Sequence, residues 1–171
     1  MCLENETATM ALNRRTIFSS DRVYRYTLWR QWLDFDRAGY VLFIGLNPST
    51  ADEHQDDPTI RRCMDYAHHW GFGALCMMNL FAFRATDPRD MKAAENPIGD
   101  TNDVLLQAYA KEAQLIVAAW GNNGAFLNRG PEVLAMLPPV HVLEMTERWH
   151  PCHPLYKRKN LWPTPLTAIH K

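Results

Sequence analysis

Four stretches of the chain are almost continuously apolar, and each is short enough to be a strand. They cover residues 40–44, 74–78, 115–120 and 140–145. Apolar runs without polar alternation are typical of strands that are buried on both faces of a sheet. Residues 23–29 alternate between polar and apolar side chains instead, which favours a half-exposed strand. The pattern therefore predicts four buried strands and one extra N-terminal strand.

Helical patterns separate the buried strands. Asp57 is a predicted N-cap, Pro58 is the first helical residue, and apolar residues follow at helical spacing until Gly71. Another helix is expected to begin near Asp100, and a third to reach Leu137. The inner side of the helix near Asp100 is expected to consist of Val104, Leu105, Ala108 and Tyr109. Strands that alternate with helices imply a three-layer α/β/α domain around a four-stranded parallel sheet.

Length and composition predict one domain. The chain has 171 residues, of which 47% are hydrophobic and 22% are charged, and this suffices for a full-sized core. Residues 1–16 are polar and lack periodicity, so we interpret them as a flexible tail before a single domain at 17–171. No apolar stretch approaches the roughly 18 residues of a membrane span. Without a recognisable signal peptide or paired cysteines, we expect a cytoplasmic protein with reduced thiols and no membrane partner.

Polar side chains follow the predicted buried strands at the points where these strands end. Asn47 and Ser49 follow the first strand, Asn79 follows the second, and residues 122–123 follow the third. A proline-rich loop that contains His153 follows the fourth strand. Ligands of open α/β sheets bind at the carboxyl ends of the strands, so these loops are a candidate site.

The residue types at these positions favour cleavage of a bond between a nucleobase and its sugar. An asparagine is no strong base, but it can hold a water molecule in line for attack. In this reaction the sugar becomes an oxocarbenium-like cation and the leaving base becomes an anion that needs a hydrogen-bond donor. We expect Asn47 to position water, Asn79 to read the amide edge of the base, and His153 to stabilise the leaving base. This hydrolysis needs no metal and no cofactor.

Simpler interpretations remain open for the same residues. An Asn-Pro pair after a strand is most often only a turn former. His150, Cys152 and His153 have the residue types of a transition-metal site. Their spacing matches no zinc pattern, however, and the prolines between them restrict convergence, so no metal is expected. Cys63 and Cys76 lie on apolar faces and are expected to fill the core.

The charge of the chain limits its nucleic-acid partners. A formal net charge of −1 argues against a protein that coats nucleic acid by bulk electrostatics. A local basic groove is compatible with this charge, and residues 157–159 (Lys-Arg-Lys) are the obvious place for one. Residues 51–57 are rich in aspartate and glutamate and are poorly suited to contact phosphates.

Four short motifs occur in the same order as in the uracil-DNA glycosylase superfamily and resemble its motifs. They are residues 45–48 (Gly-Leu-Asn-Pro), 79–84 (Asn-Leu-Phe-Ala-Phe-Arg), 115–121 and 153–155 (His-Pro-Leu). The fuller pattern over residues 23–157 resembles the DUF1643 family of uncharacterised bacterial and phage proteins. The resemblance to the glycosylases implies their fold, with DNA or a nucleotide as the substrate.

The resemblance also implies roles for particular residues. Asn47 and His153 would be catalytic, and Leu155 or Tyr156 would wedge into the duplex. Phosphates would be held by Ser49 and the basic residues 157–159. The substrate-binding set is Gly45, Pro48, Ser49, Asn79, Phe81, Arg84, Leu155, Tyr156 and Lys157.

The chain departs from the glycosylase pattern in two ways. It has no aromatic residue between Asn47 and Tyr66 to stack on a base, and its last motif lacks the His-Pro-Ser-Pro of uracil enzymes. Two alternatives therefore stay open. The protein would be a hydrolase of free nucleotides, or a module that binds a base without cutting.

Overall fold

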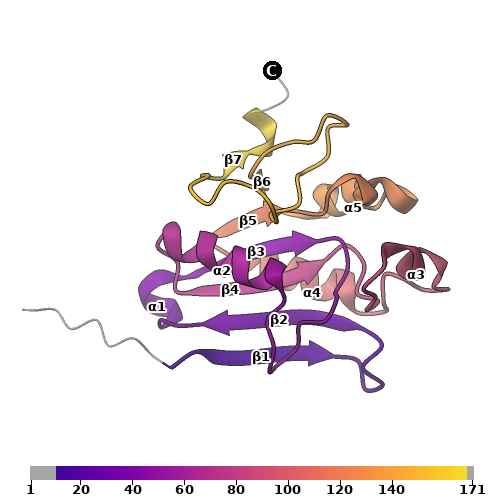
Figure 1. Ribbon diagram of the computed structural model, residues 1–171, viewed down its shortest axis with the longest axis horizontal. Helices are drawn as coiled ribbons and strands as arrows, with labels where there is room; N and C mark the ends of the chain where they lie inside the picture. The colour runs from indigo at the N-terminus through magenta and orange to yellow at the C-terminus, as the bar shows by residue number, and fades with distance from the viewer. Residues whose placement is uncertain (1–10, 169–171) are drawn as a thin grey trace, which may run out of the picture.

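A mixed seven-stranded sheet forms the centre of the computed structural model, which describes residues 11–168 (Figure 1). Its strand order is β1-β2-β4-β3-β5-β6-β7. The strands are β1 (Asn13–Phe18), β2 (Arg25–Gln31), β3 (Tyr40–Gly45), β4 (Ala74–Asn79), β5 (Leu115–Ala118), β6 (His141–Val142) and β7 (Thr164–Pro165). The neighbours β4, β3, β5 and β6 run parallel, whereas β1, β2 and β7 pair antiparallel. The α/β class is confirmed, but antiparallel strands extend the sheet beyond the four parallel strands that were expected.

Helices cover both faces of this sheet (Figure 1). The helices are α1 (Phe35–Ala38), α2 (Pro58–His69), α3 (Pro88–Ala93), α4 (Asn102–Glu112) and α5 (Arg129–Met136), with 3-10 turns η1 (Asn122–Asn128) and η2 (Leu166–Ala168). Side chains alternate along β3. Val41 and Phe43 pack with α2, whereas Leu42 and Ile44 pack in the cluster that includes residues of α3, α4 and α5. The continuous apolar run of β3 thus reflects burial on both faces.

The N-terminal strands differ from the sequence-based prediction. Residues 13–16 belong to β1, although we predicted that they form part of a flexible tail, whose residues 1–10 lie outside the described residues. β2 is buried along almost its whole length. It lies between β1 and β4 in the sheet, so it is not the half-exposed strand that its alternating sequence suggested.

The last predicted strand is shorter than its apolar run. β6 contains only residues 141–142. After Val142 the chain leaves the sheet and pairs with itself, because Cys152 donates its N–H to the carbonyl of Glu144 at 2.9 Å and Met145 bridges Pro151. This self-pairing makes the loop that contains His153 a structured one.

The helices show where local sequence signals suffice. The Asp57 side chain caps α2 by accepting the N–H of Ile60 at 2.9 Å, as predicted. The inner face predicted for α4 is right for Leu105 and Tyr109, which are partly buried against the core, but wrong for Val104 and Ala108, which are exposed. Asn102, Leu106 and Ala110 are the buried residues of this helix. Asn102 turns inward to donate to backbone carbonyls after β4, and this sets the phase of the helix. Among the described residues, no helix combines the length and the apolar character needed to span a bilayer.

Candidate functional site

A cavity of about 330 Å³ lies at the carboxyl ends of β3, β4 and β5 and beside the start of α2. Its walls are partly apolar, with Met77, Ala119 and Trp120 among them. Asn47, Asn79 and His153 also line it, so the three side chains that we expected to converge do so. A partly apolar cavity with a few converging polar groups is typical of a small-molecule site, and its size is near the lower end of the usual range of about 300–1,000 Å³.

Hydrogen bonds fix the orientation of the Asn47 amide. Its Nδ2 donates to the carbonyl of Pro48 at 3.1 Å and to the carbonyl of Ala85 at 2.8 Å. Both acceptors are carbonyl oxygens, so the amide cannot be flipped without losing both bonds. Within residues 11–168, no side chain or backbone group donates to Asn47 Oδ1, and this acceptor remains for a ligand or a water molecule.

The side-chain amide of Asn79 is buried, and its N–H group has no hydrogen-bond acceptor among the described residues. Its side chain is 3% exposed, and its Nδ2 has no hydrogen-bond partner among the described residues. The backbone at this point is held firmly, since Asn102 donates to the carbonyls of Asn79 and Leu80, and Arg129 donates to the carbonyl of Leu80. A buried, unpaired donor costs about 1–3 kcal/mol. An acceptor that reached this buried atom would recover that cost.

His153 presents a defined tautomer. The backbone N–H of Leu155 donates to Nδ1 of His153 at 3.2 Å. Nδ1 therefore accepts a hydrogen bond, and the neutral ring carries its proton on Nε2. His153 is exposed, but partial loss of hydration lowers its pKa from 6.5, and the charge of Asp57 opposes this effect. At neutral pH the ring is consequently uncharged, with one N–H donor at Nε2.

Two charged side chains that sequence reasoning did not assign to the site also line the cavity. They are Arg25 of β2 and Asp57, the N-cap of α2. Arg25 is 2% exposed, donates to the carbonyl of Ala51 at 2.8 Å, and leaves its Nε without a partner among the described residues. Burial lowers the pKa of Arg25 to about 10, and the charge of Asp57 opposes that lowering. The sequence predicted Asp57 only as the N-cap of α2 and did not indicate that it also lines the cavity.

The cavity also has an aromatic wall that the sequence analysis did not identify. Trp120 follows β5, is buried, and lines the cavity. A methyl group at Gly124 would lie 2.1 Å from Cδ1 of Trp120, so the indole packs directly on that glycine. The cavity therefore has an aromatic face, although no aromatic residue lies between Asn47 and Tyr66.

The remaining substrate-binding candidates fall into two groups. Gly45 and Ser49 line the cavity. Pro48 is buried, and its carbonyl accepts hydrogen bonds from Asn47 and Ala85. Phe81 is fully buried in the core, where it packs with Phe126, so the expectation that it contacts substrate is wrong.

Other candidates lie around the cavity. Arg84 lines a neighbouring hollow together with Ser49 and donates to the carbonyl of Arg22. Leu155 lines another hollow, on the side of α2. Tyr156 is 93% exposed, and Lys157 forms an ion pair with Glu144 at 2.8 Å. Lys157 is thus already paired and is a weaker phosphate ligand than its sequence suggested.

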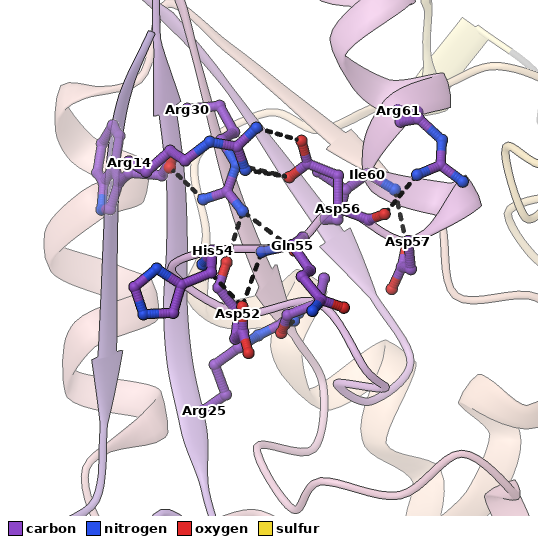
Figure 2. A network of polar contacts seen from close by, with 12 residues as sticks. Arg14, Arg25, Arg30, Asp52, His54, Gln55, Asp56, Asp57, Ile60 and Arg61 are labelled. Carbon is purple, nitrogen blue, oxygen red and sulfur yellow. Dashed lines mark hydrogen bonds and ion pairs between the residues drawn. The ribbon is translucent and has the colours of Figure 1, made fainter.

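The acidic segment at residues 51–57 is compensated by arginines of the adjacent strands (Figure 2). Asp56 accepts hydrogen bonds from Arg14 at 2.9 and 3.0 Å and from Arg30 at 2.7 Å. Glu53 pairs with Arg22 at 3.0 Å. The expectation that this segment is poorly suited to contact phosphates stays a prediction. Among the described residues, arginines pair with Glu53 and Asp56 but not with Asp52 and Asp57.

These ion pairs make stability sensitive to acid. Burial alone would raise the pKa of Asp56, but the hydrogen bonds from Arg14 and Arg30 outweigh it and lower the pKa below 3.8. The stabilisation is therefore complete above the unfolded-state pKa and is lost as pH falls through the lower folded-state pKa. We expect the difference in free energy of unfolding between wild type and Asp56→Asn to stay constant above about pH 5 and to shrink below it. Denaturant titrations across this range measure it, and a difference that grows on acidification contradicts the assignment.

The cysteine and histidine cluster does not assemble a metal site in the described part of the chain. Within residues 11–168, no group of three or more His, Cys, Asp or Glu side chains has an arrangement that could hold a metal ion. Cys63, Cys76 and Cys152 are buried and free, and burial raises the pKa values of Cys63 and Cys76 well above their usual range. Cys63 and Cys76 therefore belong to the core, as predicted.

Fold and site together define an α/β protein with a partly apolar cavity at the carboxyl edge of its parallel strands. Residues 25–155, well over half of the chain, match the family described as "Protein of unknown function (DUF1643)", and the chain belongs to this family. Comparison with curated proteins and with solved structures found no match. The matched range includes β2 to β6 and every residue of the cavity, whereas β1 lies before it.

Proposed function

We propose that the cavity binds a nucleobase and hydrolyses the bond that joins the base to its sugar. The observation that carries this proposal is the convergence of Asn47, Asn79 and His153 in one partly apolar cavity. Asn47 and His153 come from two loops, and Asn79 is the last residue of β4. Each offers a different hydrogen-bonding group. Asn47 offers an oriented acceptor, Asn79 an unpaired donor, and His153 a neutral N–H.

These groups match the needs of the reaction. Asn47 Oδ1 accepts a hydrogen bond from the attacking water and orients it. The buried amide of Asn79 pairs with the amide edge of the base, and recovers the cost of its missing partner. His153 Nε2–H donates to the base as the glycosidic bond breaks and negative charge develops there. A neutral histidine suffices, because it donates a hydrogen bond without having to transfer a proton.

We further propose that the substrate base belongs to DNA and that the fold is related to the uracil-DNA glycosylase superfamily. The order of the four motifs supports this relation. The exposed Tyr156 beside the histidine loop supports a contact with a polymer, as do Arg61, Arg62 and Lys159 in the neighbouring hollow. Ser49, between the cavity and the hollow of Arg22 and Arg84, is placed to contact a phosphate.

A base-binding module is the second candidate. The same three side chains would recognise a base without cutting, and Asn47 supplies no basic group of its own. Release of free base from labelled single-stranded and double-stranded oligonucleotides and from nucleotides distinguishes the hydrolase from the base-binding module. The panel carries uracil, hydroxymethyluracil and other modified bases. Release above the spontaneous background supports hydrolysis, whereas tight binding without release supports the module.

Gly45 offers a test of the base-reading role of Asn79. A methyl group at position 45 would lie 2.9 Å from Oδ1 of Asn79, so Gly45→Ala must displace that amide. We expect about tenfold weaker binding of the preferred base, the size of one lost hydrogen bond, with a loss of stability of about 1 kcal/mol. In a double-mutant cycle, adding Gly45→Ala to Asn79→Ala should weaken binding no further. Additive losses would show that position 45 acts independently of Asn79.

A further inference from the structure

The proposed hydrolysis leaves one proton without an acceptor. The attacking water must lose a proton as it bonds to the anomeric carbon of the sugar. The Asn47 amide has no appreciable basicity, and both of its N–H groups are bound to carbonyls. His153 faces the leaving base in this scheme and carries its own proton at Nε2. A separate base must therefore lie in the cavity.

Among the described residues that line the cavity, the ionisable side chains are Arg25, Asp57 and His153. Arg25 is a buried cation and accepts no proton. Asp57 is thus the single carboxylate among the described residues of the cavity wall. Its charge acts on both Arg25 and His153, which shows that the three groups lie within electrostatic reach of one another.

One oxygen of Asp57 is committed and the other is not. Oδ1 accepts the N–H of Ile60 at 2.9 Å, which fixes the carboxylate at the start of α2 (Figure 2). Within the described part of the chain, no group donates to Oδ2. The neighbouring carboxylates differ, because Asp56 is paired with two arginines and Asp52 accepts the N–H groups of His54 and Gln55. Of these three aspartates, Asp57 alone lines the cavity.

We propose that Asp57 is the general base of the hydrolysis and takes the proton of the water that Asn47 positions. This inference rests on the proposed function. The water oxygen bonds to the anomeric carbon, and the C–N bond breaks. Its electron pair stays on the base, which is stabilised by His153 Nε2–H. The water proton moves to Asp57 and is then released to solvent. The cavity thereby contains the carboxylate that its sequence motifs did not supply.

The test uses substitutions that keep the N-cap of α2 and remove the carboxylate proposed as the general base. Asparagine and serine are N-cap residues of about the same strength as aspartate, so Asp57→Asn and Asp57→Ser preserve α2. We expect both variants to remain folded and to bind the substrate oligonucleotide as tightly as wild type. Their single-turnover rate of base release should be about 10²–10⁴-fold lower, the usual contribution of a general base.

Asp87→Asn is the matched control. Asp87 caps α3 in the same way, by accepting the N–H of Arg89 at 2.8 Å, but it does not line the cavity. This variant should release base at the wild-type rate. If wild type releases base and Asp57→Asn does so equally fast, the general-base role is overturned while the proposed hydrolysis stands. If wild type binds every base of the panel and releases none, both are overturned.

Discussion

His153→Ala is expected to lower the single-turnover rate of base release by about 10²–10³-fold while leaving substrate binding almost unchanged. The reason is that Nε2–H acts on charge that exists only in the transition state, and one lost donor of this kind typically has this effect. The measurement is release of labelled base with enzyme in excess, alongside the dissociation constant of the same oligonucleotide.

The control for this prediction is His54→Ala. His54 is exposed in the loop before α2 and does not line the cavity, so its loss should leave the rate unaltered. His153→Gln adds a graded test, because its amide retains an N–H donor and should preserve part of the rate. A His153→Ala protein that loses binding and rate in equal proportion would mean that the ring holds the ground state instead.

Arg30→Ala is expected to reduce the free energy of unfolding by about 3–5 kcal/mol, the usual cost of breaking a buried ion pair from one side. The Arg30 side chain has no exposure and donates to Asp56 and to the backbone carbonyls of Trp29 and Asp52. Its removal takes a fully buried donor from each of these acceptors, and Asp56 retains only the partly exposed Arg14 as an ion-pair partner. Because whole domains are stable by only about 5–15 kcal/mol, the variant should approach the limit of folding.

Arg14→Ala provides the comparison. Arg14 bonds the same carboxylate, but its side chain is 30% exposed and Asp56 keeps Arg30 as its partner. We expect a loss of no more than about 1 kcal/mol, as for other solvent-accessible pairs. Urea titrations of both variants measure the two values. Equal losses would show that the loop before α2 does not depend on the buried arginine.

The central strands and their loops could be predicted because the relevant information is local. The runs at residues 40–44 and 74–78 are apolar throughout, which is how doubly buried strands must read. Parallel pairing then places the carboxyl ends of β3, β4, β5 and β6, and the segments that follow them, at one edge. The co-location of Asn47, Asn79 and His153 follows from this topology without knowledge of any side-chain contact.

Features that depend on distant partners could not be predicted. β1 contains Arg14 and Arg15 and has no apolar pattern, because it is an edge strand whose pairing is specified by β2. Arg25 appeared to be a polar residue of a half-exposed strand until packing buried it in the cavity wall. Phe81 follows a motif asparagine, and only the position of Phe126 shows that it faces the core. No local pattern carries these relations.

The loops around the cavity are bonded to one another through their backbones. Phe81 donates its N–H to the carbonyl of Leu46, Ala85 to that of Pro48, and Gly121 to that of Pro151. The cavity is consequently preformed in the absence of a ligand, and little conformational entropy of the loops is lost when a ligand binds. Rigid walls of this kind favour ligands whose shape matches the cavity. A change of ligand preference would therefore require substitution of a wall residue such as Met77 or Ala119. Lengthening a loop would break the backbone hydrogen bonds that give the cavity its shape.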